Sequence, residues 1–568
     1  MGEPATRLTA QAALDAFFAA YYRRRPVTAT FTGVHDHDSM LPDWSPDGLA
    51  DAVSEMRDLR RTLVDAGHGR ESEVPTFPEG VDLALADAFL EIQIAEHEGP
   101  RFYRGNASLW TGEAIFSVLS LVTRDFAPVT ERLASATDRL DAIPGFLAAA
   151  RHTLVRAAPE GTARAQRECT AAVTLFAEAL PDWASAPAVP GSLRSRFAEA
   201  SIAAAAAFRE LGAWIAASLA TRARHEDANE DFLALLIRRG HWVDQSPAAL
   251  LAEAREALAE SIRSLDAMAR PYGGWHTVQD TLAGIHPTVE AYLPRFQQIW
   301  DDCHAAAAEH DLVAWPEAPI RYVPIPAHTR AVAPHLYYLF YRSPAAFDRV
   351  DVYDYVVPSV DADLPSSLQA ERLRAANDSV IKLNHVIHHG AIGHHVQNHH
   401  AYQGRSRVGQ VAAIDGASRI GMFGGGTMAE GWACYACDLM EEVGFLTPLE
   451  SIAQQQTRVR LAARSVVDLA MHTGQMTLDE AVAIYRDRAG MPDGAARSEA
   501  AKNSMFPGTA VMYWLGVRGL HALRAQQSRR DGRAFSLRRF HDALLGHGAI
   551  PVALVDRLMT NETVSHHG

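Results

Sequence analysis

The chain has 568 residues, of which 48% are hydrophobic and 21% are charged. This composition supplies a large core and excludes global disorder. A formal net charge of -15 and the lack of a basic run argue against a nucleic-acid partner, because phosphate contacts need clustered lysine and arginine. Four cysteines in so long a chain do not suggest a disulfide scaffold.

The amino terminus and the most apolar window bear on where the protein resides. The opening residues, MGEPATRLTAQAALDAFF, lack the basic start and uninterrupted apolar stretch of a signal peptide. The most apolar window, SIAAAAAFRELGAWIAASLA, carries Arg209 and Glu210 at its middle, which argues against a membrane span. We therefore expect a cytoplasmic protein with neither a membrane nor a nucleic acid as partner.

Helical spacing of apolar residues dominates the chain, for example in residues 129–157 and 250–269. From about 317 to 358, aromatic and β-branched residues alternate between prolines, which predicts a short sheet. We expect a mainly α fold with a helical N-terminal lobe over 1–315 and a C-terminal lobe over 316–568 that contains the sheet. One continuous domain is the alternative.

Residues 384–400, NHVIHHGAIGHHVQNHH, contain seven histidines. A histidine-rich helix can be a solvated face, and single histidines such as His399 and His400 are commonly packed and hydrogen-bonded. As a set they are harder to explain in this way, because neutral imidazole is the commonest side-chain ligand for zinc-like ions. The cluster is therefore a candidate metal site.

Spacing restricts which of these histidines can share an ion. On a regular helix, residues four apart lie within about 40° of one another, whereas residues six apart diverge by about 120°. His385 and His389 are thus eligible, and His388 with His394 are not. The glycines of the intervening GAIG tolerate unusual backbone conformations, so a bulge or loosened turn would bring His394 back toward His388. Local geometry leaves both pairs open.

The stretch HHGAIGHHVQ resembles the active-site motif H-E-x-x-P-G-H-H-x-Q of the bacterial family known as domain of unknown function 885. Downstream, AEGWACYACDLMEEVG resembles the family's E-G-W-A-x-Y-x-E helix, and RLAARSVVDLAMHTGQMTLDEA resembles its R-x-x-V-D-x-x-x-H segment. FPGTAVMYWLG resembles P-G-x-A-x-x-Y-x-x-G. The specific similarity covers about 335–557. The family looks like helical zinc metallopeptidases, so the resemblance implies a metallopeptidase-like fold with a central cleft.

The resemblance implies three metal ligands, His388, His394 and Glu430, on helices of the C-terminal lobe. Such a set leaves a fourth position open for water or substrate, as in a catalytic site for Zn²⁺ or another divalent transition metal. From the residues alone, Glu430 is typical of an ordinary acid near a helix N-terminus.

The chain also departs from the family's pattern. Where the family has a glutamate that moves a proton from water to the leaving group, this chain has His389. Ile392 replaces the motif's proline, Lys502 stands where arginine is common, and Thr509 stands where glutamine is common. An imidazole suits acid and base chemistry near neutrality and can also become a ligand. A cation-capable group beside a metal favours an anionic substrate.

Other residues are candidates for catalysis. Asp468 and His472 lie four apart on one helix face, so the carboxylate can orient the imidazole, or each can face the substrate. The resemblance implies that a histidine and Tyr513 stabilise an oxyanion. The alternative for Tyr513 is a buried aromatic residue beside Trp514.

Four further residues are candidates for substrate binding. Arg464 and Lys502 are expected to hold a substrate carboxylate. Tyr337 and Tyr338, in the strand-like region, are candidates for lining the cleft, although packing explains them nearly as well.

Three functions stay open at this point. The first is a metal-dependent hydrolase of the amidase or peptidase type, acting on a small carboxylated or peptide-like substrate. The second is a repurposed metal-dependent lyase or isomerase of small-molecule metabolism, in which His389 deprotonates the substrate. The third is a metal-binding protein without catalysis.

Overall fold

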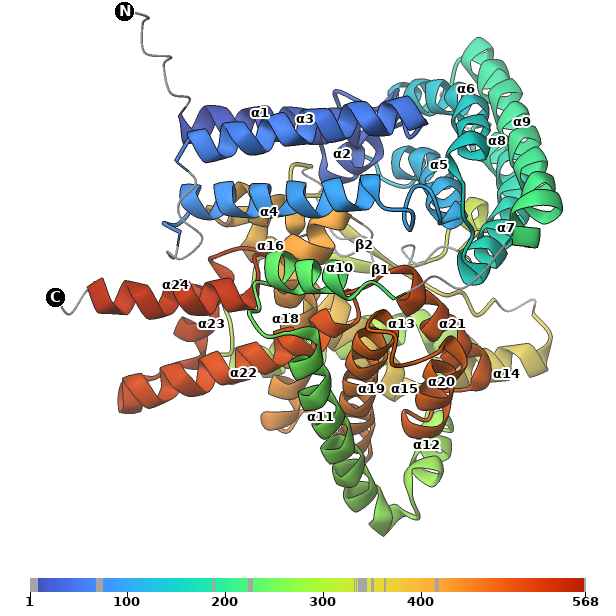
Figure 1. Cartoon of the computed structure of the whole chain (residues 1–568). Helices are drawn as coiled ribbons and strands as arrows, with labels where there is room; N and C mark the ends of the chain where they lie inside the picture. Colours follow the sequence, from blue (N-terminus) through green and yellow to red (C-terminus); the bar gives the residue numbers. More distant parts are fainter. Residues whose placement is uncertain are drawn as a thin grey trace, which may run out of the picture. The chain divides into compact units, whose positions relative to one another are not determined.

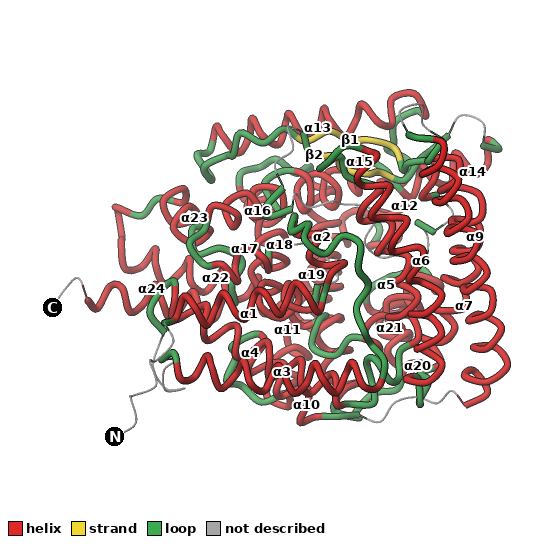
Figure 2. The backbone as a smooth tube through the Cα atoms, turned by 90° about the horizontal axis from the view of Figure 1, so that it is seen from above, coloured by secondary structure: helices red, strands yellow, loops and turns green. Residues whose placement is uncertain are grey.

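Helices make up most of the chain, as the apolar spacing predicts. The computed structural model describes residues 9–67, 75–185, 189–222, 228–330, 332–333, 335, 345–348, 352–361, 364–413 and 418–565. Within these residues the mainly α fold is confirmed, and β1 and β2 are the only strands (Figure 2). The chain divides into two compact units, and each unit is made of separate segments of the sequence.

Unit 1 takes its described residues from Met1–Asp227, Ile325–Leu339 and Ala345–Val350. Its helical elements, including π-helical and 3-10 segments (η), are α1 (Ala10–Arg24), α2 (Pro26–Thr32), α3 (Pro46–Asp65), α4 (Glu79–Glu98), α5 (Ala107–Val122), α6 (Val129–Thr153), α7 (Pro159–Thr174), η1 (Leu175–Ala179), α8 (Leu180–Trp183), α9 (Gly191–Trp214), η2 (Ile215–Leu219), η3 (Ala220–Arg222) and η6 (Ala327–Thr329). Helices α1, α3 and α4 lie side by side, and α6 packs along α9 (Figure 1).

The core of unit 1 includes a long apolar segment. Among the described residues, Gly191–Leu219 is the one stretch with the length and composition to cross a membrane. Its side chains Phe197, Phe208 and Leu211 are fully buried in a cluster with Trp110. The most apolar window of this stretch is 39% buried, so packing within unit 1 accounts for part of its apolar composition.

Unit 2 takes its described residues from Ala228–Pro324, Phe340–Pro344 and Asp351–Gly568. Its elements are α10 (Glu230–Leu235), η4 (Leu236–Gly240), α11 (Pro247–Ala269), η5 (Arg270–Tyr272), α12 (Trp275–Ala283), α13 (Val289–Glu309), β1 (Ile320–Pro324), β2 (Tyr353–Val357), α14 (Ser366–Ala375), α15 (Asp378–Val380), η7 (Ile381–Gly390), α16 (His394–Gln403), α17 (Arg407–Ala412), η8 (Gly421–Gly425), α18 (Gly426–Glu442), α19 (Pro448–His472), α20 (Leu478–Ala483), η9 (Ile484–Arg488), α21 (Asp493–Met505), α22 (Val511–Asp531), η10 (Gly532–Ala534), α23 (Leu537–Leu545) and α24 (Val552–Ser565).

The boundary between the units lies at 227/228 and not at the expected 315/316. The physical reason is the core of unit 2, in which α11 packs along α19. Leu250 and Leu258 of α11 share one buried cluster with Val459 and Val466 of α19. Helix α11, which precedes residue 315, therefore forms part of the core of the later half of the chain.

The predicted short sheet is present as a parallel pair in unit 2. β1 and β2 align Ile320 with Tyr353 and Pro324 with Val357. Tyr322 and Tyr355 face each other in this register, and both are buried. The hydroxyl of Tyr355 lies 2.8 Å from Nδ1 of His385, so the sheet contacts the histidine-rich segment.

Two long helices of unit 2 position the candidate site. α19 begins with a capping box, in which Thr447 and Glu450 satisfy each other's backbone N–H groups, and Pro448 occupies the first helical position. α18 crosses α22 where Gly431 meets Gly516, and a Cβ atom on either glycine would overlap the other helix. This close approach sets α18 directly against α22.

Candidate functional site

The histidine-rich segment contains a break between two helical pieces. η7 is π-helical over its ten residues and ends at Gly390, and α16 begins at His394. Within the turn, a Cβ atom at Gly393 would overlap the backbone oxygen of His388, so only glycine fits there. The turn is held by two indole N–H groups, which donate to the carbonyls of Gly390 and Ile392 at 2.8 Å each.

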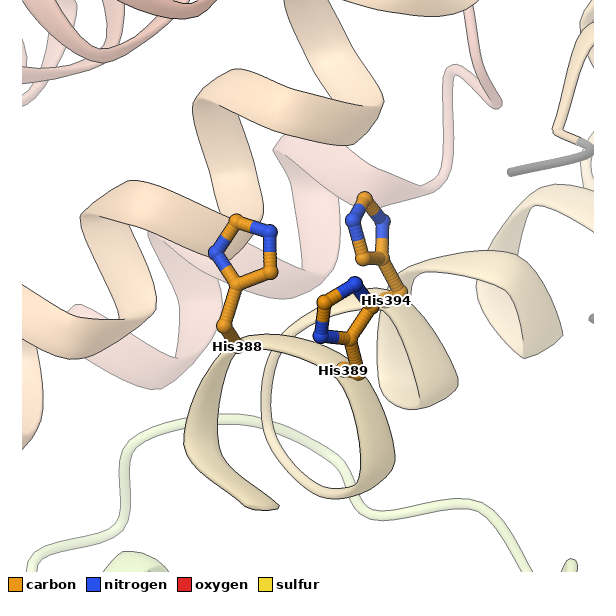
Figure 3. A group of neighbouring side chains, drawn as sticks. All are labelled: His388, His389 and His394. Carbon is orange, nitrogen blue, oxygen red and sulfur yellow. The ribbon is translucent and has the colours of Figure 1, made fainter. Parts of the chain in front are cut away.

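Three imidazoles meet across this break. His388 and His389 leave the last turn of η7, and His394 leaves the first turn of α16 (Figure 3). The ring centroids of His388 and His394 are 4.9 Å apart, and each residue of the three offers a ligand atom within 4.8 Å of the others. Of the two pairs that spacing leaves open, the structure therefore brings His388 and His394 together.

His385 belongs to a different environment. Its Nδ1 lies 2.8 Å from the Tyr355 hydroxyl, and its ring packs against Phe296. Burial lowers the pKa of His385 to about 4. This histidine is accordingly a packed, hydrogen-bonded residue of the sheet side.

Glu430 brings a carboxylate to the same place from α18. Its Oε2 lies 3.4 Å from Nε2 of His388 and 3.4 Å from Nε2 of His394. These distances exceed the usual 2.7–3.2 Å of an N–H···O hydrogen bond. Bonds of about 2.0–2.1 Å at tetrahedral angles place two zinc ligands about 3.3–3.4 Å apart. The distances from Glu430 to the two imidazoles fit this spacing.

The pKa values of two groups in this set, Glu430 and His388, are shifted. Oε2 of Glu430 is buried and accepts no hydrogen bond from the described residues. Burial would raise the pKa of Glu430, but His394 and His388 together lower it well below its usual value. Burial lowers the pKa of His388, although Glu430 opposes the change. A carboxylate and neutral imidazoles are the forms that bind a divalent ion, and the shifts of Glu430 and His388 favour those forms.

His389 adjoins this set. Its Nδ1 lies 2.8 Å from the backbone oxygen of Asn384, to which Nδ1 donates. In the neutral ring Nε2 is then the acceptor nitrogen. Burial, followed by the nearby His388 and His394, lowers the pKa of His389 well below its usual value. His389 is thus a neutral base candidate or an alternative third ligand.

Asp468 and His472 are adjacent but turn toward backbone. The carboxylate of Asp468 accepts hydrogen bonds from the amides of Gly508, Ala510 and Val511 at 2.8–2.9 Å. It thereby caps the start of α22, which has no cap of its own. Burial raises the pKa of Asp468 to about 7, against the effect of these amides. His472 donates from Nε2 to the Asn503 carbonyl, and their catalytic roles stay predictions.

The candidates for substrate binding fall into two groups. Arg464 donates from Nε to Glu499 at 2.6 Å, and its guanidinium lies 4.9 Å above the Tyr513 ring. Lys502 is half-buried. Burial of Glu499 would raise the pKa of this carboxyl, but Arg464 and, to a smaller extent, Lys502 lower it to about 2. Tyr337 and Tyr338 lie outside the described residues.

Two residues of this region carry no signal in the sequence motifs. Glu499 lies on α21 and pairs with Arg464. Arg460 lies one helical turn before Arg464 on α19. The spacing of four residues between the two arginines is visible in the sequence, but their different partners are not.

Comparison with known proteins identifies the family of the chain. A family model described as "Bacterial protein of unknown function (DUF885)" matches residues 26–559. The chain belongs to the DUF885 family. A comparison with curated proteins finds no match.

Two solved structures share the fold. One is "a putative lipoprotein of unknown function" from Shewanella oneidensis, with a TM-score of 0.76, 20% identity and coverage of 97% of this chain and 100% of that chain. The other is "the putative lipoprotein" from Colwellia psychrerythraea, with a TM-score of 0.75, 17% identity and coverage of 97% and 98%. The prediction of a cytoplasmic protein is wrong by this comparison, since both matched proteins are described as lipoproteins.

Proposed function

We propose that this DUF885 member is a metal-dependent hydrolase of the amidase or peptidase type. His388, His394 and Glu430 would hold a Zn²⁺ ion or another divalent transition metal. The observation that carries the proposal is the position of Glu430 Oε2, which is buried, accepts no hydrogen bond from described residues, and lies 3.4 Å from both imidazole nitrogens. A divalent ion bound there supplies Lewis-acid chemistry, which polarises a carbonyl and makes water more acidic.

The chain's own residues would perform the remaining steps. His389 presents a neutral acceptor nitrogen, because its Nδ1 proton is donated to Asn384. It would take a proton from water and deliver it to the leaving nitrogen, the task of the glutamate in the resembled motif. Tyr513 is half-buried beside Arg464 and would donate a hydrogen bond to the developing oxyanion.

The test combines metal content with turnover. We expect the purified chain to bind one Zn²⁺, and a panel of N-acetyl amino acids and dipeptides to contain a substrate whose hydrolysis stops with chelator and returns with Zn²⁺. His388→Ala should lose both properties. His400→Ala is the matched control, since His400 lies in the same cluster but donates to the Ala314 carbonyl. Full zinc content and full turnover in His388→Ala would contradict the proposal.

A second candidate, a lyase or isomerase that removes a proton from carbon, is favoured by the imidazole at 389. A neutral imidazole suits proton removal from a carbon acid next to a polarised carbonyl. His389→Glu separates the candidates. Under the hydrolase proposal the variant keeps or gains amide hydrolysis with the native substrate, whereas under the second candidate it gains peptidase activity and loses the native reaction.

A further inference from the structure

Trp432 joins α18 to the turn between η7 and α16. Its side chain is fully buried, and its indole N–H donates to the Ile392 carbonyl at 2.8 Å. In a regular α-helix this carbonyl would accept from the amide of Val396, but that amide donates to the Ala391 carbonyl at 3.2 Å. The indole therefore supplies a donor to a carbonyl whose helical partner is engaged elsewhere, because the helix breaks at this turn.

α18 and the indole are each held in place by packing. α18 crosses α22 where Gly431 meets Gly516, and neither glycine leaves room for a Cβ atom. The indole ring of Trp432 meets the ring of His541 edge-on, with 5.2 Å between the ring centroids. His541 is itself held, since its Nδ1 donates to the Leu312 carbonyl at 2.6 Å. The indole N–H thus reaches the turn from a fixed position.

Glu430 and Trp432 reach the histidine-rich segment in two directions. Residues two apart on a helix point about 160° away from each other. Glu430 brings Oε2 to 3.4 Å from an imidazole nitrogen on each side of the break, whereas Trp432 binds the backbone of the break itself. Ile392 lies two residues before His394, so a shift of the Ile392 carbonyl would move this imidazole relative to the carboxylate.

We infer that Trp432 is a positioning residue of the candidate metal site, whose indole N–H keeps His394 at the distance from Glu430 at which both bind one ion. This inference rests on the proposed function for the ion, and it holds whichever reaction the ion supports. Groups that orient metal ligands without touching the metal typically change metal affinity by about 10–100-fold. Trp432 acts through the backbone two residues before the ligand, so we expect an effect of about tenfold.

The test measures Zn²⁺ affinity and the visible spectrum of bound Co²⁺, not turnover. Trp432→Phe removes the N–H donor and leaves the Ile392 carbonyl unpaired. We expect about tenfold weaker Zn²⁺ binding in competition with a chromophoric chelator. The Co²⁺ absorption depends on the number and angles of the ligands, so it should weaken and shift as His394 moves.

A second variant separates the hydrogen bond from the packing of the ring. Replacement of Trp432 by its sulfur isostere, 3-benzothienylalanine, keeps both rings and removes only the N–H. No cavity is created in the core, so this variant is expected to fold even where Trp432→Phe does not. It should show the same loss of Zn²⁺ affinity and the same change in the Co²⁺ spectrum.

Trp110→Phe is the matched control. Trp110 is also fully buried, and its indole N–H donates to the Tyr103 carbonyl at 2.9 Å, but it lies in the core of unit 1. Trp110→Phe and Trp432→Phe should therefore lower the urea midpoint of unfolding by similar amounts. Trp110→Phe should keep the native Zn²⁺ affinity and the native Co²⁺ spectrum.

The outcomes distinguish this inference from the proposed function. A loss of affinity confined to the two Trp432 variants supports the inference. Native affinity and a native Co²⁺ spectrum in the isostere overturn it and leave the metal site standing. An equal loss of affinity in Trp110→Phe also overturns it, because the effect would then follow stability alone. A native chain that binds neither Zn²⁺ nor Co²⁺ overturns the inference together with the proposed function.

Discussion

Two buried carboxylates of unit 2, Glu430 and Asp468, lie beside histidines, yet their hydrogen bonding differs. Asp468 accepts hydrogen bonds from three backbone amides and so caps α22. Glu430 keeps an oxygen that accepts no hydrogen bond within the described part of the chain, and that oxygen lies between two imidazole nitrogens. The first arrangement is complete within the protein, whereas the second leaves an acceptor oxygen to which the proposed function assigns a metal ion.

The comparison gives a criterion that separates a proposed metal ligand from a structural carboxylate when both are buried acids near a histidine. Residue type and spacing are similar in the two cases, because each acid lies on a long helix and each histidine is within 4 Å of it. What differs is whether backbone donors already occupy the carboxylate oxygens. Substitution by the isosteric amide therefore affects two different properties at the two positions.

Glu430→Gln should produce the largest effect, on metal affinity. Loss of the anionic ligand leaves two neutral imidazoles, so we expect the Zn²⁺ affinity to fall by roughly 100-fold or more. The metal-free variant should also lose some stability above pH 4.5, because a pKa lowered by His394 and His388 means that folding stabilises the Glu430 carboxylate. Competition with a chromophoric chelator gives the affinity, and urea unfolding gives the stability. An unchanged affinity would place the ion elsewhere, with His389 as the next ligand to test.

Asp468→Asn should differ from Glu430→Gln in metal affinity, because its carboxylate binds backbone amides. The amide nitrogen of asparagine would face backbone N–H groups at the start of α22, and a buried donor without an acceptor costs about 1–3 kcal/mol. We expect the free energy of unfolding to fall by about that amount while Zn²⁺ affinity stays native. The same two assays measure both quantities. If Zn²⁺ affinity falls as in Glu430→Gln while stability is retained, Asp468 belongs to the metal site and its cap of α22 is not important for stability.

The sequence predicted the fold class and the short sheet because both depend on local patterns of apolar and β-branched residues. It left two histidine pairs open, because the choice depends on the turn after Gly390 and on Tyr355, which binds His385 from a distant strand. The partners of Asp468 lie some forty residues away and are backbone groups, which no side-chain motif records. The boundary between the compact units differs from the expected lobe boundary for a similar reason, since α11 packs on α19 across a long sequence separation.

The sequence also named Arg464 and Lys502 as candidates for binding a substrate carboxylate. The structure pairs Arg464 with Glu499, a partner on α21 that the spacing along α19 does not reveal. Motif positions identify which helix carries a candidate residue, whereas the partners of its side chain are known only from the structure.

Unit 1 contains a third arrangement of histidine and carboxylates, which is neither a candidate metal site nor a helix cap. His35 lies 2.8 Å from Asp38 through Nδ1 and 2.8 Å from Asp348 through Nε2, and its ring stacks on Phe126 at 4.0 Å. Burial would lower the pKa of His35, but the hydrogen bonds to Asp348 and Asp38 raise it to about 9. Here both ring nitrogens are donors, so the imidazolium itself is the cation between the carboxylates.

His35→Gln should show the smallest effect, which depends on pH. Because the folded pKa of about 9 lies above the unfolded value of 6.5, the stabilisation from His35 is complete below pH 6.5 and is lost as pH rises through 9. The side chain is 32% exposed, so solvent screening limits the gain to about 1 kcal/mol or less. Urea unfolding of the native chain and the variant, each at pH 6 and pH 9.5, gives the difference between their free energies of unfolding. Titrations that the two chains share cancel in this difference. A native advantage that persists at pH 9.5 would mean that His35 stabilises unit 1 by packing on Phe126 and not by its charge.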